Sequence, residues 1–234
     1  MTDTSVRAIG MRTNNAELIA DCAALGYLSG RVLDPTYGLG RFWNTYRPDD
    51  LTAVDIDPRR GVIRADFRSL PFDDNTFNAC TFDPPYKLNG TSTGKGAATS
   101  DDDYGVAGEY QSITQRHQLM YDGITECARV TRGHLIVKCQ DQICSGSLHM
   151  QTHLMTDHAR ALGCTLVDVL HVQGYRRQPH GRRQLHARRD YSTALVFEVP
   201  EHTIKPVVQA EPAHMSDEEI ELVDALFKLF EGVE

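Results

Sequence analysis

The sequence predicts an α/β fold: a doubly wound sheet of seven mostly parallel strands with an antiparallel last strand. Two observations predict it. Short apolar runs rich in β-branched residues alternate with segments of helical apolar spacing from about residue 15 to residue 163. Two more apolar runs, 164–172 and 192–199, then follow with no helical segment between them. This pattern is typical of a doubly wound sheet that finishes with an antiparallel pair.

The first half of the chain supplies one helix and four strands. Residues 15–26 have apolar side chains at helical spacing, next to an asparagine that can cap the helix. A short apolar run inside 29–42 breaks into a glycine-rich turn and predicts the first strand. The segments 51–57 and 61–66 each end in an acidic residue and predict the second and third strands. The fourth strand is predicted within 75–85.

The second half begins with a long polar segment. Residues 87–109 are rich in Gly, Ser, Thr and Asp, and we expect a mobile loop there because structural segments continue on both sides of it. A helix is predicted over about 110–130, the fifth strand over 134–140 and a further helix over 148–163. The two last strands complete the sheet.

The composition indicates a soluble globular protein. The chain has 234 residues, of which 41% are hydrophobic and 24% charged, and no apolar run approaches the roughly 20 residues that span a bilayer. The N-terminus does not resemble a secretion signal, so we expect a cytoplasmic protein that does not contact membranes. The six cysteines occur singly, without a C-x-x-C pair, so we expect reduced, mostly buried thiols and no metal site.

We expect one domain over 1–200 and an acidic tail over 201–234. The whole chain carries a net charge of −8, and the tail alone accounts for −7. Ser216 and Glu219 form a capping-box pattern ahead of an amphipathic run, which predicts a helix in the tail. We expect this helix to dock on the domain's own surface, with a homodimer or partner contact as the alternative.

The turn after the first strand, DPTYGLG (34–40), is placed for ligand binding. Ligands of doubly wound sheets bind beyond the carboxyl ends of the strands. Gly38 and Gly40 would let the backbone pass close to a ligand with its N–H groups facing that ligand. The turn lacks the third glycine of the dinucleotide fingerprint, so a smaller nucleoside ligand is the better interpretation.

Acidic residues end the second and third predicted strands and suit the same ligand. Asp55 or Asp57 can accept hydrogen bonds from two ribose hydroxyls, and Asp66 can accept one from an adenine amino group. Ile56 and Phe67 are the candidate apolar walls of this site. An acidic residue in such a position also commonly caps the following helix, so each signal is weak by itself.

The segment Asp83 to Tyr86, D-P-P-Y, follows the fourth strand and suits chemistry on an exocyclic amine of a nucleobase. The lone pair of such an amine is delocalised into the ring, so the amine is a poor nucleophile. If the Asp83 carboxylate and the Pro84 carbonyl each accept an N–H, the lone pair becomes available. Pro84 and Pro85 would hold that carbonyl toward the site, and Tyr86 would stack on the base. The alternative is a rigid exit from a strand.

Together the segments DPTYGLG, VDID, RADFRSLPFDDNTF and FDPPY resemble the successive motifs of the class I S-adenosylmethionine-dependent methyltransferases. D-P-P-Y is similar to the motif of the DNA amino-methyltransferases that act on adenine N6. The resemblance implies a Rossmann-like methyltransferase fold and S-adenosylmethionine as cofactor. It implies the methionine part of the cofactor near Asp34, Gly38 and Gly40, with Tyr37 as the aromatic residue before the glycines. It places Asp55 on the ribose, Asp66 on the adenine, and Asp83, Pro84, Pro85 and Tyr86 at the catalytic centre.

No large segment that would form a separate target-recognition domain follows D-P-P-Y in this sequence, and in this respect it departs from such enzymes. We therefore expect nucleic-acid contacts from loop 87–109 and from residues 175–191, which carry a charge of +5. The alternative for 175–191 is a solvated surface hairpin. The candidate phosphate contacts are Arg176, Arg177, Arg182, Arg183, Arg188 and Arg189.

Two further groups of polar residues lie in the second half of the chain. Lys138, Gln140 and Asp141 follow the fifth strand and can reach the substrate, although Asp141 can equally cap a helix. His149, His153 and His158 lack the spacing of a zinc site.

The function expected from the sequence is methyl transfer from S-adenosylmethionine to an exocyclic amino group of a nucleobase, first of all adenine N6 in DNA. The alternatives are adenine N6 or guanine N2 in RNA, and cytosine N4 in DNA. An interpretation from another class is a nucleic-acid-binding or cofactor-binding module without turnover.

Overall fold

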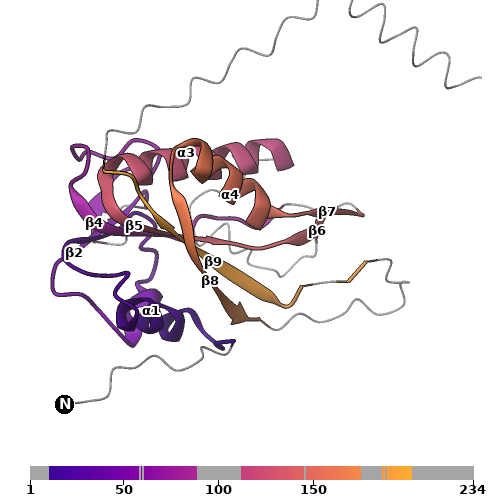
Figure 1. Cartoon of the computed structure of the whole chain (residues 1–234), viewed down its shortest axis with the longest axis horizontal. Helices are drawn as coiled ribbons and strands as arrows, with labels where there is room; N and C mark the ends of the chain where they lie inside the picture. Colours follow the sequence, from indigo (N-terminus) through magenta and orange to yellow (C-terminus); the bar gives the residue numbers. More distant parts are fainter. Residues whose placement is uncertain are drawn as a thin grey trace, which may run out of the picture.

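The computed structural model describes residues 11–57, 59, 61–88, 112–144, 146–174, 186, 187 and 189–201. A seven-stranded sheet lies between helix α1 (Asn15–Ala24) on one face and helices α3 (Ile113–Val130) and α4 (Gln151–Ala161) on the other (Figure 1). The predicted doubly wound α/β fold is therefore confirmed. A short 3-10 helix, η1 (Arg41–Asn44), follows the glycine turn.

The sheet has the order β3-β2-β1-β4-β5-β9-β8. Strands β1 to β5 pair in parallel, and β9 is antiparallel to both of its neighbours, β5 and β8. The chain order reverses beside β1, which is the switch point where open α/β sheets bind ligands. The strands are β1 (Val32–Asp34), β2 (Leu51–Asp55), β3 (Ile63–Arg64), β4 (Phe77–Phe82), β5 (Thr131–Cys139), β8 (Thr165–Gln173) and β9 (Tyr191–Glu198).

The central strands are apolar on both faces because helices cover both faces. Along β5, Leu135 packs in the core beneath α3 and α4, whereas the next residue, Ile136, packs in the core beneath α1. This alternation decides on which face each polar residue at the strand ends lies.

Helices α1 and α3 begin at residues whose side chains cap them. Asn14 caps α1, and its side chain accepts a hydrogen bond of 2.9 Å from the backbone N–H of Glu17. Ser112 and Gln115 form a reciprocal capping box at the start of α3. None of the described helices is long and apolar enough to cross a bilayer.

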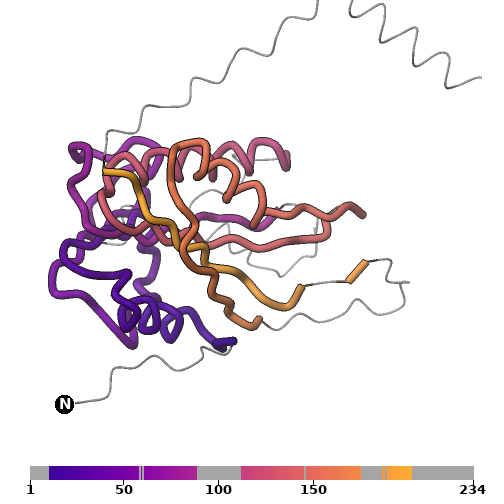
Figure 2. The backbone as a smooth tube through the Cα atoms, viewed as in Figure 1, coloured from indigo at the N-terminus to yellow at the C-terminus, as the bar shows by residue number. Residues whose placement is uncertain are grey.

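One part of the secondary-structure prediction is wrong. The helix predicted over 148–163 begins only at Gln151, because a small hairpin of β6 (Gln142–Cys144) and β7 (Ser147–His149) precedes it. Gly146 has φ of 82° between the two strands, a conformation that glycine adopts readily. The hairpin projects beyond the carboxyl end of β5 (Figure 2).

The six cysteines are all buried free thiols, as the sequence predicts. The amphipathic segment of the tail, residues 216–230, and the boundary proposed at residue 201 fall at or outside the limits of the described chain.

Candidate active site

Four polar side chains form a row across the carboxyl edge of the sheet, on the face covered by α1. Asp34 ends β1, Asp83 follows β4, Lys138 lies near the end of β5, and Ser192 lies near the start of β9. Phe82 of β4 pairs with Val137 of β5, and both side chains pack in the core beneath α3 and α4. The alternation of side chains therefore places the next residues of both strands on the α1 face.

Asp34 is buried and well supplied with hydrogen bonds. Its Oδ2 accepts from Trp43 Nε1 at 2.7 Å, and its Oδ1 accepts from the backbone N–H of Thr36 at 3.0 Å. Burial raises the pKa of Asp34 to about 7, although these donors oppose the rise, and the nearby charge of Asp83 adds to it. Asp34 thus holds η1 and the glycine turn against β1.

Asp83 carries an unused acceptor. Its backbone N–H donates to Thr36 Oγ1 at 2.9 Å, which fixes the chain as it leaves β4. Its Oδ1 is closed to solvent and accepts no hydrogen bond from the described residues. Burial raises the pKa of Asp83, and the positive charges of Lys138 and Lys87 oppose that rise. A buried carboxylate oxygen without a donor is costly, so a ligand N–H would stabilise it.

The backbone after Asp83 closes into a tight turn. The N–H of Tyr86 donates to the carbonyl oxygen of Pro84 at 2.7 Å. One of the two lone pairs of the Pro84 carbonyl is therefore used within the turn, and the other remains available as an acceptor, so the expected role of this carbonyl stays a prediction. Pro84 and Pro85 are both buried.

Three buried side chains donate hydrogen bonds to the backbone carbonyl oxygens of this turn. Arg116 Nη1 of α3 donates to the carbonyl oxygen of Pro85 at 3.2 Å. Gln142 Nε2 of β6 and Gln151 Nε2 of α4 donate to the carbonyl oxygen of Tyr86 at 2.9 and 2.8 Å. We refer to Arg116, Gln142 and Gln151 as the carbonyl clamp. The half-buried Tyr86 packs against the core beneath α3 and α4, so its ring has a fixed support.

The glycine turn has the backbone that the sequence predicts but a different pattern of hydrogen bonds. Gly38 and Gly40 have φ of 54° and 66°, and a Cβ on Gly40 would lie 2.6 Å from Tyr37 Oη. The N–H of Gly38 donates to Asp55 Oδ2 at 2.7 Å, and that of Gly40 to the carbonyl oxygen of Tyr37 at 2.8 Å. The expectation that these N–H groups face a ligand is wrong, because the turn satisfies them internally.

Asp55 and Asp57 differ in how far their carboxylates are engaged. Asp57 forms an ion pair with Arg59, whose Nη2 lies 2.7 Å from Asp57 Oδ2. Each oxygen of Asp55 accepts one backbone N–H, from Gly38 and from Asp57 at 2.8 Å. Since a carboxylate offers about four acceptor positions, Asp55 retains capacity for hydroxyl donors.

The third strand contributes less to a ligand site than the sequence predicts. Burial alone would raise the pKa of Asp66, but hydrogen bonds and charge from Arg68 outweigh it and leave that pKa below its ordinary value. Arg68 Nη2 lies 2.5 Å from Asp66 Oδ2, so this carboxylate is already paired. Phe67 packs edge-on against Phe82, with ring centroids 5.1 Å apart, at the border of the core.

Apolar surface is nevertheless exposed beside the first two strands. Ile56, a predicted wall, is 40% exposed, and Leu39, between the two glycines, is 58% exposed. Leu39 was not a predicted site residue, although an apolar side chain in a tight turn could have indicated it. Asp55 with these two residues fits a nucleoside, which presents ribose hydroxyls and an apolar ring face.

Gln140 and Asp141, which follow β5, form hydrogen bonds that hold neighbouring elements together. Gln140 Nε2 donates to the carbonyl oxygen of Tyr191 at 2.7 Å. Asp141 Oδ1 accepts from the backbone N–H of Thr152 at 2.9 Å, so the capping alternative for Asp141 is the one found. The two residues tie the end of β5 to β9 and to the first turn of α4.

The three candidate histidines lie in different surroundings. His158 stacks on Tyr121 with ring centroids 4.7 Å apart. The ring centroid of His149 lies 6.1 Å from that of His117. His153 lines a groove between α4 and the strands β8 and β9. In the part of the chain that the structure describes, no three His, Cys, Asp or Glu side chains are grouped to hold a metal ion.

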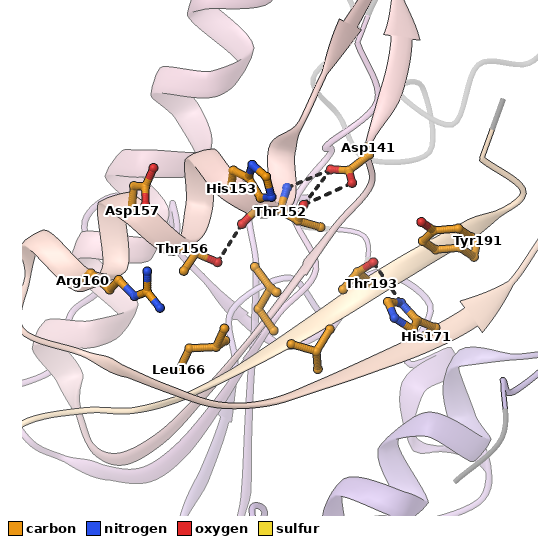
Figure 3. Close-up of a pocket in the computed structure, with 12 residues that line it drawn as sticks. Asp141, Thr152, His153, Thr156, Asp157, Arg160, Leu166, His171, Tyr191 and Thr193 are labelled. Atoms are coloured by element: carbon orange, nitrogen blue, oxygen red, sulfur yellow. Dashed lines mark hydrogen bonds between the residues drawn. The ribbon is translucent and has the colours of Figure 1, made fainter. Parts of the chain in front are cut away.

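The groove between α4 and the strands β8 and β9 has a volume of about 550 Å³ (Figure 3). It lies on the opposite face of the sheet from Asp83, as the alternation of side chains along β9 shows. Thr193 and Leu195 of β9 line it, whereas Ser192, the residue before Thr193, contacts Lys138 on the α1 face. Asp141 and Thr152 lie at the groove and are hydrogen-bonded to each other (Figure 3). The sheet therefore separates the groove from the candidate active site.

The nucleic-acid contacts expected from sequence lie almost wholly outside the described residues. Arg189 is described, and its Nη1 donates to the carbonyl oxygen of Ala187 at 3.1 Å. Residues 89–109 of the expected loop are likewise outside. The remaining arginines outside the described chain are Arg176, Arg177, Arg182, Arg183 and Arg188.

The strand order and the antiparallel β9 agree with the family resemblance noted from the sequence motifs. The chain has the fold of the class I methyltransferases. No protein-family model matches the sequence, and no curated protein matches it.

Solved structures of similar fold include TrmN from Thermus thermophilus, at 18% identity and a TM-score of 0.45 over 79% of this chain. The chain spans about half, 48%, of the length of TrmN. A putative methyltransferase from Bacillus halodurans matches at 12% identity and a TM-score of 0.49, over 78% of this chain and 98% of that one. Magnesium protoporphyrin IX methyltransferase from Synechocystis PCC 6803, solved with bound SAH, matches at 10% identity and a TM-score of 0.48, over 79% of this chain and 80% of that one. At these identities the likeness concerns the fold alone.

Proposed function

We propose that the chain is a methyltransferase that moves a methyl group from S-adenosylmethionine to an exocyclic amino group of a nucleobase, first of all adenine N6 in DNA. The observation that carries this proposal is the unpaired Oδ1 of Asp83, closed to solvent at the carboxyl edge of the sheet. An amino group offers the N–H donor that this oxygen lacks.

The chain's own residues supply orientation and hydrogen bonding. S-adenosylmethionine, when bound, supplies a methyl group on a positively charged sulfur. The Asp83 carboxylate accepts one N–H of the target amine, and the second lone pair of the Pro84 carbonyl accepts the other. With S-adenosylmethionine bound, the amine nitrogen would form a bond to the methyl carbon while the carbon–sulfur bond breaks, and the electron pair of that bond would stay on sulfur. The amine then releases one proton, for which Asp83 is the nearest acceptor.

The carbonyl clamp supports this geometry. Arg116, Gln142 and Gln151 hold the backbone of Pro85 and Tyr86 from three different elements, so the turn does not need to reorganise when a base enters. A base stacked on Tyr86 would have its amine in line with the reacting carbon. An apparatus of this kind favours turnover over a binding module without catalysis.

The donor is assigned to the edge of β1 and β2. Asp55 has acceptor capacity left for ribose hydroxyls, and the exposed Ile56 and Leu39 would cover the adenine ring. Asp34 and the turn through Tyr37, Gly38 and Gly40 would border the methionine part. Because Asp66 is paired with Arg68, the adenine amino group would reach it only in competition with that guanidinium.

A polymer substrate is favoured by the +5 charge of residues 175–191, which gathers positive charge in one segment while the rest of residues 1–200 carries −6. The same acceptors suit adenine N6 or guanine N2 in RNA and cytosine N4 in DNA. These alternatives differ from adenine N6 in DNA only in the base or polymer that reaches Asp83.

The decisive experiment incubates the full chain with methyl-labelled S-adenosylmethionine and a panel of DNA and RNA, followed by mass spectrometry of the nucleosides. We expect labelled N6-methyladenine from DNA with the parent and none with Asp83→Asn. Label on another base amine would keep the reaction class and change the base. Label in none of the polymers would contradict the proposal.

A second measurement tests the donor site without turnover. Calorimetry with a chelator present should detect binding of S-adenosylmethionine and of its demethylated product to the parent and, within a few-fold, to Asp83→Asn. The charge on Asp83 acts on the target amine, so the donor affinity should survive its removal. If neither compound bound to the parent, the donor assignment would fall.

A further inference from the structure

Lys138 is a lysine buried to 1% exposure in the row of polar residues at the carboxyl edge of the sheet. Its Nζ donates to Asn15 Oδ1 of α1 at 2.9 Å and to Ser192 Oγ of β9 at 2.8 Å. Three elements thus fix the position of one ammonium group. Both of these acceptors are neutral, so neither balances the charge that has been taken out of water.

The neighbouring strand provides the opposite charge. Phe82 of β4 pairs with Val137 of β5, so Asp83 and Lys138 follow as neighbours across the parallel ladder, both on the α1 face. Asp83 Oδ1 accepts no hydrogen bond from the described residues, and the two acceptors that Lys138 Nζ reaches carry no charge. Each group therefore supplies what the other needs electrostatically.

Two other charged groups face Asp83. Lys87, four residues further along the chain, is exposed, and its charge is screened by water. Asp34, the last residue of the neighbouring strand β1, repels Asp83 when both are ionised. Lys138 is therefore the cation whose effect on Asp83 is least weakened by solvent.

The titration behaviour of the two groups agrees with this geometry. Burial raises the pKa of Asp83, and the charge of Lys138 is the largest opposing influence. Burial lowers the pKa of Lys138, and the charge of Asp83 is again the largest opposing influence. Each group thus favours the charged form of the other.

We propose that Lys138 is a positioning residue for the transfer reaction, whose ammonium, fixed by Asn15 and Ser192, keeps the neighbouring Asp83 carboxylate ionised. The inference rests on the proposed function and extends it to a residue that does not itself touch the target base. The ionised form matters because a protonated Asp83 would carry an O–H donor and lose part of its capacity to accept an N–H and the released proton.

The first test compares Lys138→Met with Lys87→Met. Both substitutions remove a lysine charge near Asp83, but only Lys138 is buried. Carbon-detected NMR of the side-chain carboxyls follows the titration of Asp83 and Asp34 in the full chain, and Asp83→Asn identifies the Asp83 signal. We expect a clear upward shift of the Asp83 midpoint in Lys138→Met and little change in Lys87→Met. An unchanged Asp83 midpoint in a folded Lys138→Met would overturn the inference.

A second variant keeps the test decisive if Lys138→Met does not fold. Coupling between two titrating groups is reciprocal, so Asp83→Asn, which preserves the size of the side chain, should shift the titration midpoint of the Lys138 ammonium to lower pH. NMR of the lysine side chains in the parent and Asp83→Asn measures this shift. A Lys138 midpoint identical in the two proteins would equally overturn the inference.

The kinetic readout then distinguishes this inference from the proposed function. If nucleobase methylation is observed, the acidic limb of its pH–rate profile should move to higher pH in Lys138→Met, while Lys138→Arg, which retains the charge, should restore the parent profile. A large loss of rate with an unmoved limb would indicate a merely structural lysine and contradict the inference. The carboxyl and lysine titrations need no turnover, so their outcome stands even if methylation fails and the proposed function falls.

Discussion

Gln151 of α4 donates a hydrogen bond from Nε2 to the carbonyl oxygen of Tyr86 over 2.8 Å, and the glutamine is completely buried. Its Oε1 accepts from the backbone N–H of Gln140 at 3.1 Å. One side chain thus joins the turn after β4 to the end of β5. The position of the Tyr86 ring consequently depends on a helix that begins 65 residues further along the chain.

Gln151→Leu should therefore destabilise the fold and slow methyl transfer. The leucine leaves the buried N–H of Gln140 without its acceptor and removes one of the two donors to Tyr86, so we expect a loss of about 1–3 kcal/mol in the free energy of unfolding. Urea denaturation measures it. Gln173→Leu, an exposed position on β8, is the matched control and should stay within about 0.5 kcal/mol of the parent. Equal losses in the two variants would contradict a special role for the clamp.

Gly40→Ala should cost more stability than Gly26→Ala. Both glycines have positive φ, 66° and 87°, so alanine is strained at either position by roughly 1–2 kcal/mol. A Cβ on Gly40 would also lie 2.6 Å from Tyr37 Oη, whereas a Cβ on Gly26 would meet no atom within 4 Å. The difference between the two variants in thermal or urea unfolding isolates the clash with Tyr37. Equal losses in the two variants would show that Tyr37 moves aside freely and would contradict the prediction.

Asp34 should make the protein less stable as pH rises from about 4 to about 7. Its pKa is about 7 in the folded state against an ordinary value of 3.8, so the folded state binds more protons over that range and stability falls as pH rises. The full effect is on the order of 4 kcal/mol, at about 1.4 kcal/mol for each pH unit between the two pKa values. Asp34→Asn should flatten this slope in urea denaturation measured at a series of pH values.

Asp66→Asn is the control, because Asp66 changes the stability with pH in the opposite direction to Asp34. Because the pKa of Asp66 lies below its ordinary value in the folded state, its contribution is present above the unfolded pKa and is lost as pH falls through the folded pKa. Asp66→Asn should thus reduce the loss of stability in acid and leave the slope between about 4 and 7 unchanged. A parent protein whose stability is flat over that range would show that Asp34 titrates normally.

The central strands could be predicted because they are short apolar runs, a pattern that reflects burial on both faces of the sheet. The β6–β7 hairpin could not, since its three-residue strands are partly polar and do not form an apolar run. The sequence also indicated which residues stand at the carboxyl edge, because Asp34, Asp55 and Asp83 each end or follow a strand.

What the sequence could not indicate is how those residues are satisfied. The N–H of Gly38 bonds to Asp55, and the N–H of Tyr86 bonds to Pro84, through hydrogen bonds that depend on the closed shape of each turn. The sequence did not indicate the carbonyl clamp either, because Arg and Gln side chains are usually exposed. Only the tertiary fold brings them to the carbonyl oxygens of Pro85 and Tyr86. Buried polar residues of this kind leave no spacing rule to follow.

The last prediction concerns the arginines of residues 175–191 and distinguishes a polymer substrate from a small molecule. If this segment binds phosphates, as proposed, Arg182→Ala combined with Arg183→Ala should weaken binding to all DNA sequences alike. It should also flatten the dependence of log affinity on log salt by about 0.7–0.9 for each phosphate that is no longer neutralised.

Affinity for a labelled DNA duplex across a salt series, in the parent and the double variant, measures this effect. Donor affinity should stay unchanged, because the proposed donor site lies beside β1 and β2, and strands β4 and β5 separate these from β9 and β8. A chain truncated after residue 200 loses a charge of −7 and should bind DNA more tightly at low salt. Identical salt slopes in the parent and the double variant would mean that the segment is a solvated surface hairpin, and residues 87–109 would become the next candidate for the nucleic-acid contacts.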